Sequence, residues 1–171
     1  MKEYADLLAD DPAYAARAAG FVAKVRDVAE LLAQVGTVAV RHPLPITIAY
    51  HDACHLAHAQ GIRAQPRQLL RQIPGLQLRE IAESEICCGS AGIYNVLHPE
   101  AANQLGDRKA ANVARTGAAL LVTANPGCLM QVASSLQRSG QQIGLAHTVE
   151  VLDASIRGLS VDQLLPTADN P

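Results

Sequence analysis

The sequence predicts an α/β fold in which a small parallel sheet of about four strands is covered by helices. Apolar runs at residues 46–50 and 119–123 have the length and composition of buried strands, residues 76–81 are interpreted as a further strand, and residues 143–147 as a weaker one. Helical segments separate these runs, and Pro, Gly and capping residues mark their ends. Strands that alternate with helices form parallel sheets, so all four strands are expected to point the same way.

A helical segment is expected ahead of the sheet, over residues 1–45. Asp11 is expected to cap a helix that runs to Gln34, with Pro12 in its first turn. Apolar residues recur in this helix at helical spacing, which predicts one buried face; they are Phe21, Val25, Val28, Leu31, Leu32 and Val35.

Further helices are expected between and after the strands, at residues 54–60, 66–72, 99–116, 126–138 and 149–157. Asp107, Arg108 and Lys109 are interpreted as the solvated face of the longest one. Gly140 is expected to end the fourth in the left-handed conformation, and Thr148 to cap the last. Residues 46–160 are thus predicted to form the main domain, and residues 161–171 a loosely held tail.

The composition is that of a globular domain with an ordinary core. The chain has 171 residues, of which 49% are hydrophobic and 18% charged, and this excludes a disordered chain. The net charge is −2 and aromatic residues make up 3%, without a basic stripe, so no nucleic-acid partner is expected.

The compartment is inferred from two absences in the sequence. No apolar run approaches the ~18 residues that span a bilayer, and the first residues do not resemble a signal peptide. The expected localisation is therefore cytoplasmic, where thiols stay reduced and clustered cysteines indicate metal binding or redox chemistry.

All four cysteines follow predicted strands. Cys54 follows the first strand, Cys87 and Cys88 follow the second, and Cys128 follows the third. Ligands of open α/β sheets bind outside the carboxyl ends of the strands. The topology therefore predicts that the four sulfurs gather at one edge of the sheet, with His147 nearby after the fourth strand.

Four clustered thiolates need positive charge to compensate them, which iron–sulfur clusters and zinc both supply. Gly89 and Gly92 are expected to let the main chain pass close to such a centre, with N–H groups aimed at its sulfurs. Zinc remains the main rival, although the chain has no Cys-x-x-Cys knuckle and an adjacent pair suits a cluster better. A disulfide is disfavoured, because adjacent cysteines are poorly placed to bridge each other.

Histidines near the cysteines are further candidates. His51, His55 and His58 are spaced like one helix face and could ligate metal, relay protons or hydrogen-bond to sulfur. Capping and packing are the plainer roles for His55 and His58. His51 and His147, at strand ends, are retained as candidate cofactor-contacting residues.

Three motifs resemble the cysteine-rich CCG domain found in heterodisulfide reductase, in lactate-utilisation proteins and in the glycolate oxidase iron–sulfur subunit, most closely the last. They are Tyr50-His51-Asp52-Ala53-Cys54-His55, Cys87-Cys88-Gly89-Ser90-Ala91-Gly92 and Asn125-Pro126-Gly127-Cys128-Leu129-Met130-Gln131. Glycolate oxidase iron–sulfur subunits carry ferredoxin-like motifs and a first cysteine-rich domain ahead of this one. The resemblance therefore implies that the chain corresponds to their C-terminal part.

The resemblance also implies an electron-transfer module that holds an iron–sulfur cluster, [4Fe–4S] in type, with Cys54, Cys87, Cys88 and Cys128 as ligands. Its implied partners are flavin-containing glycolate oxidase subunits, with peripheral association with the inner membrane through the complex. Gln131 stands where the heterodisulfide reductase motif has a fifth cysteine, which argues against a non-cubane cluster. A thiol/disulfide or quinone-reducing site, and a structural zinc or interaction domain, are the alternatives.

Overall fold

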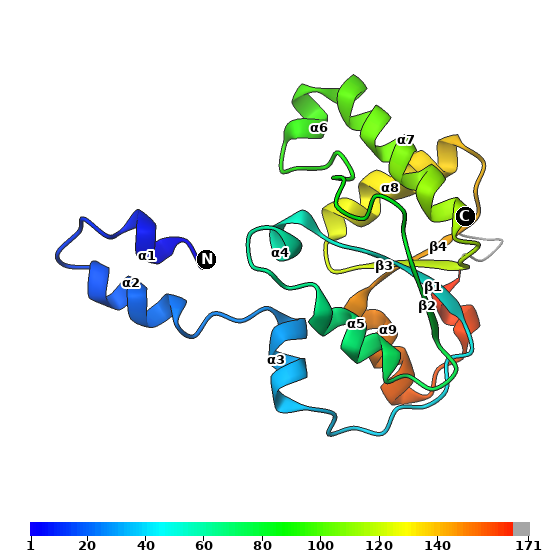
Figure 1. Ribbon diagram of the computed structural model, residues 1–171, viewed down its shortest axis with the longest axis horizontal. Helices are drawn as coiled ribbons and strands as arrows, with labels where there is room; N and C mark the ends of the chain where they lie inside the picture. Colours follow the sequence, from blue (N-terminus) through cyan, green and yellow to red (C-terminus); the bar gives the residue numbers. More distant parts are fainter. Residues whose placement is uncertain (166–171) are drawn as a thin grey trace.

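Four parallel strands form the sheet at the centre of the structure, a computed structural model that describes residues 1–165 (Figure 1). They are β1 (Thr47–His51), β2 (Gln77–Glu80), β3 (Leu120–Thr123) and β4 (Gly144–His147). Their spatial order is β2-β1-β3-β4, and every neighbouring pair is parallel. The predicted α/β class and the four strands are confirmed.

Helices cover both faces of this sheet (Figure 1). Helices α5 (Ala64–Arg71) and α9 (Thr148–Arg157) lie on one face, and α7 (Pro99–Arg115) and α8 (Pro126–Arg138) on the other. Side chains of a strand point alternately to the two faces. Ile48 and Tyr50 of β1 accordingly lie in the core with α5 and α9, whereas Ala49 lies in the core with α7 and α8.

The order of the strands creates a switch point between β1 and β3. From β1 the chain passes through α4 (Cys54–Ala57) and α5 to β2 on one side. It then crosses through α6 (Tyr94–Leu97) and α7 to β3, on the other side of β1. The loops after β1 and β3 diverge at such a point and leave a crevice at the carboxyl edge, which is where open α/β sheets bind ligands.

The N-terminal segment differs from the prediction of one helix up to Gln34. It forms three short helices, α1 (Tyr4–Leu7), α2 (Ala15–Val22) and α3 (Val28–Val35). The break comes at Asp27, whose carboxylate accepts from the Ala29 N–H (2.8 Å) while Glu30 accepts from the Asp27 N–H (3.2 Å). This capping box begins a new helix, because it satisfies N–H groups that have no partner in the first turn.

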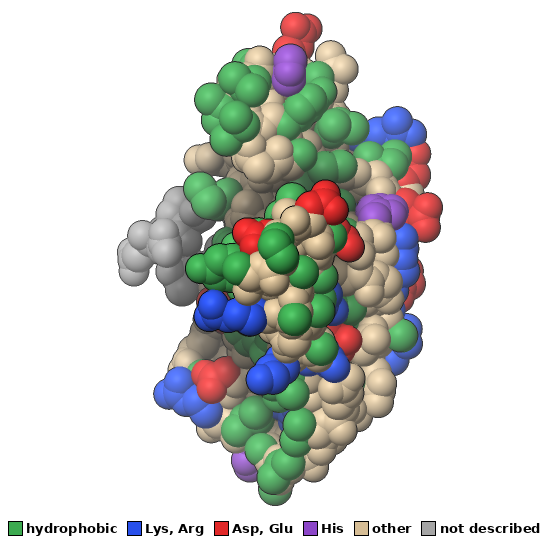
Figure 2. All heavy atoms as spheres, turned by 90° about the vertical axis from the view of Figure 1, so that its left-hand side faces the viewer, with side chains coloured by type: hydrophobic (Ala, Val, Ile, Leu, Met, Phe, Trp, Pro, Cys, Tyr) green, Lys and Arg blue, Asp and Glu red, His purple; other side chains and the backbone are tan. Residues whose placement is uncertain are grey.

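The predicted buried face of this segment is also mostly wrong. Ala29 of α3 is buried and Leu32 packs against the core, but Phe21 is 45% exposed and Val35 61% exposed. Helix α3 packs against α5, whereas α1 and α2 pack against each other and lie apart from the sheet (Figure 1). Figure 2 views the molecule from this side, with exposed hydrophobic side chains over the N-terminal helices and, at the top, around α6.

The end of the described chain packs against the body of the fold. Residues Val161–Leu164 form a 3-10 helix, and Leu164 and Leu165 pack against the core of the α5 and α9 face. The predicted tail covers residues 161–171, of which 166–171 lie outside the described residues. Within residues 1–165, no helix combines the length and the apolar composition that crossing a bilayer requires.

Candidate metal centre

The end of β1 is held rigidly by a buried ion pair. Arg67 of α5 donates from Nη1 to Asp52 Oδ1 (2.8 Å) and from Nη2 to Asp52 Oδ2 (2.7 Å). Its Nε also donates to Glu80 Oε1 on β2 (2.9 Å), and its guanidinium lies 4.9 Å from the centre of the Tyr50 ring. A bidentate pair of this kind fixes orientation as well as distance. It therefore fixes the backbone that presents His51 and Cys54.

The second segment, with Cys87 and Cys88, is a tight loop packed against the first turns of α7. The Gly89 N–H donates to Cys87 Sγ (3.3 Å), as expected for a backbone group aimed at a sulfur. Gly89 has a φ of +94°, and a Cβ there would lie 2.4 Å from the Ala102 carbonyl oxygen. Gly92 also has a positive φ, +63°, but the space around it is open. Glycine at position 89 is therefore required both by conformation and by the approach of α7.

The third segment places Cys128 in the first turn of α8. Asn125 caps this helix, and its Oδ1 accepts from the Cys128 N–H (2.9 Å). The thiol of Cys128 thus lies at a helix N-terminus, where the dipole favours negative charge. A Cβ on Gly127 would lie 2.9 Å from Ser90 Oγ, so this turn packs directly against the Cys87–Cys88 loop.

The structure brings all four thiols together. Cys54 interacts with Cys87, Cys87 with Cys88, and Cys88 with Cys128, which makes one continuous series. Cys88 and Cys128 are buried, whereas Cys54 and Cys87 are half-buried, and all four are free. The Sγ atoms of Cys88 and Cys128 and a ring nitrogen of His51 lie within 4.8 Å of one another.

Crowding and burial favour the protonated thiols of Cys54, Cys87 and Cys88 when no cation is bound. Interaction with Cys128, together with burial, raises the pKa of Cys88 to about 11. The pKa of Cys87 is raised by its interaction with Cys88 and by burial, and that of Cys54 by burial and by Cys87. A bound metal ion reverses this preference, since a coordinating thiol is deprotonated outright.

His51 is a buried imidazole without hydrogen-bond partners. It is 1% exposed, and neither Nδ1 nor Nε2 has a partner among the described residues. Burial, followed by the positive charge of Lys109, lowers its pKa to about 4, so the ring is neutral at pH 7. Buried polar groups are normally paired. A bound group that accepts from or is ligated by this ring would supply the missing partner.

Thr123 is a second unpartnered polar group at this point, and no sequence motif indicated it. It is the last residue of β3, beside His51 in the register, and its Oγ1 is buried without a hydrogen-bond partner in the described chain. Both side chains face α7 and α8, because Ala49 and Leu121, two residues earlier in each strand, lie in that core. The ends of β1 and β3 therefore present two polar side chains, His51 and Thr123, that have no hydrogen-bond partner within residues 1–165.

The other histidines are placed differently from His51. His147 is the N-cap of α9, where its Nδ1 accepts from the Val149 N–H (3.3 Å), and it is not in the group formed by His51, Cys88 and Cys128. The cap was expected at Thr148, and that prediction is wrong by one residue. His55 and His58 are exposed. His51 belongs to β1 rather than to a helix, so the three do not share a helix face.

Lys109 contradicts the prediction of a solvated face on α7. Its side chain is fully buried, and Nζ donates to the Glu83 carbonyl oxygen (2.8 Å), in the turn that leads into Cys87. Asp107 and Arg108 are exposed, as expected. The signal was present in the sequence, since the buried positions of α7 recur every three or four residues; they include Ala102, Gly106, Lys109, Ala110 and Val113.

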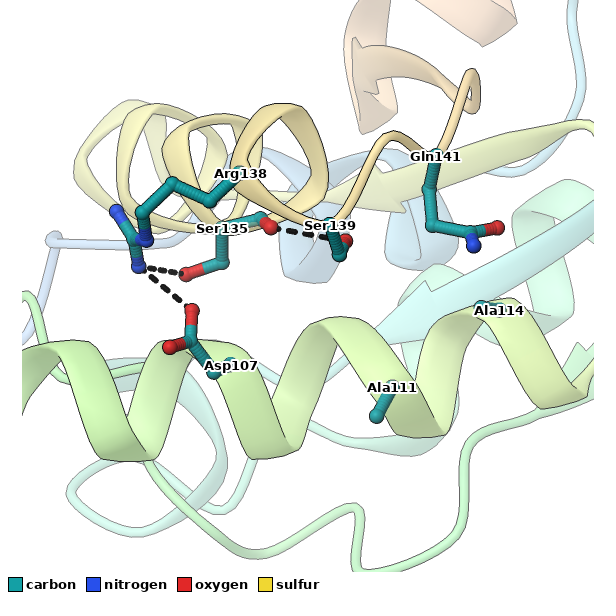
Figure 3. A pocket seen from close by; sticks show the side chains of 7 residues that line it. All are labelled: Asp107, Ala111, Ala114, Ser135, Arg138, Ser139 and Gln141. Atoms are coloured by element: carbon teal, nitrogen blue, oxygen red, sulfur yellow. Dashed lines mark hydrogen bonds and ion pairs between the residues drawn. The ribbon is translucent and has the colours of Figure 1, made fainter.

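Helices α7 and α8 pack closely against each other next to the backbone of Cys88. A Cβ on Gly106 of α7 would lie 2.6 Å from Ser135 Oγ of α8 and 3.4 Å from the Cys88 carbonyl oxygen. Beside this contact, Arg138 donates to Asp107 (2.6 Å) and to Ser135 Oγ (2.8 Å). Asp107, Ser135 and Arg138 line a groove of about 490 Å³ (Figure 3), and most of the polar side chains drawn there form hydrogen bonds or ion pairs with one another. The groove does not include the cysteines.

Gln131 also joins the two helices. Its Nε2 donates to the Ala102 carbonyl oxygen (3.2 Å), and its Oε1 accepts from Asn95 of α6 (3.2 Å). The residue that stands at the position of a fifth cysteine is thus fully engaged in holding α8 against α6 and α7.

The donor set fits an iron–sulfur or zinc centre. Four thiols and a neutral imidazole are soft to borderline ligands, which suit both. The unpartnered nitrogens of His51 and the clustered free thiols are the features that a bound centre would satisfy.

Comparison with known proteins supports this interpretation. A family model described as "Cysteine-rich domain" (CCG) matches residues 48–133. The chain is 41% identical over 155 residues to the probable glycolate oxidase iron-sulfur subunit of Bacillus subtilis, covering 90% of this chain and 35% of that protein. It is 36% identical over 152 residues to lactate utilization protein A of Halalkalibacterium halodurans, covering 88% and 62%. It is 33% identical over 153 residues to the uncharacterized protein YkgE of Escherichia coli, covering 89% and 64%.

The chain therefore spans about a third of the first of these relatives and somewhat less than two thirds of the other two. The family match covers half of the chain and contains all four cysteines, with Cys54 and Cys128 in the first turns of α4 and α8 and Cys87 and Cys88 in the loop after β2. From the sequence motifs, the fold and this match together, the chain belongs to the CCG cysteine-rich domain family.

Proposed function

We propose that this chain is an electron-transfer module of a system that oxidises a 2-hydroxy acid such as glycolate, with Cys54, Cys87, Cys88 and Cys128 as ligands of an iron–sulfur cluster of the [4Fe–4S] type. The relatives named for glycolate oxidase and lactate utilization support the substrate class. Bound there, a cluster would take up one electron at a time from a reduced donor and pass it on. Oxidation of the hydroxy acid itself would belong to a flavin-containing partner subunit.

The series of four thiols is the observation that carries this proposal. Among residues 1–165, only Cys88, Cys128 and His51 offer ligand atoms that all lie within 4.8 Å of one another, and Cys54 and Cys87 continue the series beyond that group. One zinc ion binds four ligands at about 2.0–2.3 Å, so all four ligand atoms would have to meet around one point. A centre with several irons can accept sulfurs spread over a longer arc, and adjacent cysteines can then bind different irons.

The chain's own residues have defined tasks in this proposal. The Gly89 N–H donates to Cys87 Sγ, and the N-terminus of α8 faces Cys128, so both stabilise negative charge on sulfur. His51 provides a neutral imidazole that can hydrogen-bond to or ligate the centre. Burial of Cys88 and Cys128 excludes water from the inner side, while Cys54 and Cys87 face the half-exposed side from which a partner would approach.

Iron, sulfide and zinc analysis of anaerobically purified protein tests the proposal. A cluster is expected to give iron and sulfide in matching amounts, brown colour and an EPR signal after reduction. Serine variants at each of the four cysteines are expected to lose most of the iron, and His51→Leu to alter the EPR signal. His55→Gln, on an exposed histidine next to Cys54, is the matched control and should leave iron content and signal unchanged.

A single zinc ion is the alternative that the tight group of His51, Cys88 and Cys128 would favour. It predicts stoichiometric zinc, no colour, and metal retention in Cys54→Ser. A thiol catalyst without metal would instead turn over a disulfide or quinone substrate in isolation. Either result would contradict the electron-transfer role.

The remaining parts of the proposal concern organisation and place. We propose residues 46–160 as the cysteine-rich domain proper, behind an N-terminal helical segment at 1–45. A cytoplasmic location is proposed, with peripheral attachment to the inner membrane through the partner subunits. Limited proteolysis tests the domain boundary: the first cuts are expected before residue 46, and early cuts within the sheet would contradict it.

A further inference from the structure

Lys109 is a buried cation that the fold has to accommodate. Its side chain is 0% exposed, and Nζ donates to the carbonyl oxygens of Glu83 (2.8 Å) and Ser84 (3.4 Å). These carbonyls satisfy its hydrogen bonds but supply no negative charge. A charged group without an opposite charge is expensive to bury, so a partner for this ammonium is expected nearby.

No carboxylate of the described chain serves as that partner. Lys109 forms no ion pair in residues 1–165, and the two acids nearest to it are already engaged. The carboxylate of Glu83 accepts from Arg108 (2.9 Å) and Asn112 (2.8 Å). The carboxylate of Asp52 is held bidentately by Arg67.

The groups that face Lys109 belong to the candidate metal centre. Its charge acts on His51, Cys87 and Cys88, in addition to Asp52 and Glu83. The turn that Lys109 holds by its two hydrogen bonds is separated from Cys87 by two residues, and Gly106, one helical turn earlier in α7, lies against the Cys88 carbonyl oxygen. With protonated thiols the ammonium has no countercharge at the centre, but with metal-bound thiolates it has one.

We propose that Lys109 is the internal counter-ion of the thiolate-bound metal centre and that it sets the centre's reduction potential and metal affinity. This rests on the proposed function, because it requires the four cysteines to ligate a metal. Four thiolates carry more negative charge than a divalent ion or an iron–sulfur core cancels, so the centre stays anionic. A one-electron reduction adds a further negative charge, which a buried cation stabilises.

The size of the effect follows from Coulomb's law. A unit charge about 10 Å from the centre, at an effective dielectric constant of about 20, changes an equilibrium constant on the order of tenfold. Removing the charge should therefore disfavour reduction about tenfold, which corresponds to a potential lower by about 59 mV for one electron. Binding of a divalent metal to four protonated thiols, with release of four protons, makes the centre more negative by two charges, so removing the cation should weaken this binding about a hundredfold.

Lys109→Met in the full chain is the principal test, with Lys109→Gln and Lys109→Arg beside it. Methionine is close to lysine in volume, and exchanging a buried charge for an apolar side chain often leaves stability unchanged or raises it. Arg157→Gln is the matched control, because it removes a positive charge from an exposed side chain on α9 that pairs with Asp153. Redox titration of the iron-loaded protein gives the potential, and Co²⁺ titration of the apo protein gives the affinity.

The inference requires lower potential and weaker Co²⁺ binding in Lys109→Met and Lys109→Gln, unchanged values in Arg157→Gln, and at least partial recovery in Lys109→Arg. If the variants load iron with unchanged potential, Lys109 only supports the Glu83–Ser84 turn and the inference is wrong, while the proposed function stands. If the wild type takes up Co²⁺ but no iron–sulfur cluster, the affinities alone decide the inference and the proposed function falls. If the wild type binds neither, both fall.

Discussion

Replacing Gly89 with alanine should push the loop that carries Cys87 and Cys88 away from α7. The added Cβ would lie 2.4 Å from the Ala102 carbonyl oxygen and 3.0 Å from the Ala102 Cα, both in the backbone of α7. A helix backbone cannot rotate away as a side chain can, so the loop that carries Cys87 and Cys88 must move. That movement would also displace the Gly89 N–H from Cys87 Sγ.

The expected loss of unfolding free energy is about 3 kcal/mol. A non-glycine residue in the left-handed region costs about 1–2 kcal/mol, and forcing atoms into a packed site costs about 1–3 kcal/mol. For a chain of this size, about 1 kcal/mol corresponds to roughly 2–4 °C in Tm, so the melting temperature should fall by roughly 6–12 °C. A domain stable by about 5–15 kcal/mol still folds after such a loss.

Gly140→Ala separates backbone strain from the clash. Gly140 has a similar left-handed φ of +66°, but nothing lies within 4 Å of the added Cβ, and it lies beyond the C-terminal end of α8, twelve residues after Cys128. It should lose only about 1 kcal/mol and load iron like the wild type. Thermal unfolding of the apo proteins and iron content after anaerobic loading would measure both effects. Equal losses of stability in the two variants, or full iron loading of Gly89→Ala, would refute the packing argument.

Three further predictions concern stability. Arg67→Met leaves the buried Asp52 carboxylate unpaired and should lower the free energy of unfolding in urea by about 3 kcal/mol. The side chain of Arg71 is 61% exposed, so Arg71→Met should change that free energy by less than about 0.5 kcal/mol. Similar losses in the two variants would mean that burial of the pair is unimportant. Arg108 and then Asn112 lower the pKa of Glu83 to about 2. Because that pKa is below the usual value of 4.5 for a glutamate, the stabilisation is complete above pH 4.5 and is lost as pH falls toward 2. The Tm difference between the wild type and Glu83→Gln should therefore shrink as pH falls over this range and stay constant above it. A Tm difference independent of pH would contradict the assignment. Bound metal should raise unfolding free energy by about 2.7 kcal/mol at a hundredfold excess over Kd, a gain that a chelator removes and that Cys128→Ser should not show; equal gains in that variant would exclude Cys128 as a ligand.

The sheet and the convergence of the cysteines could be predicted from short-range patterns. Three of the strands are apolar runs next to turns, and the cysteine motifs follow β1 and β3 directly and β2 after a short loop. Parallel pairing then brings the ends of the strands to one edge whatever the details of packing. This is why the positions of Cys54 and Cys128 near the Cys87–Cys88 pair followed from the order of elements alone.

Predictions failed where a residue could serve two structural purposes. The run of apolar residues from Phe21 to Val35 has a continuous helical period, yet Asp27 caps a new helix within it. Thr148 was expected to cap α9, but the ring nitrogen of His147 caps it instead. In both cases a local hydrogen bond to the backbone N–H groups competes with the role that the pattern suggested.

The sequence by itself determined the α/β class, the succession of strands and helices along the chain, and the set of cysteines that share one edge of the sheet. Only the tertiary structure decided that Lys109 and Thr123 are buried beside them, that His51 has no hydrogen-bond partner within residues 1–165, and that Gly89 touches α7. Periodicity tells which face of a helix or strand a residue occupies. Whether that face meets solvent, a backbone or a thiol depends on the element packed opposite, which lies tens of residues away in the sequence.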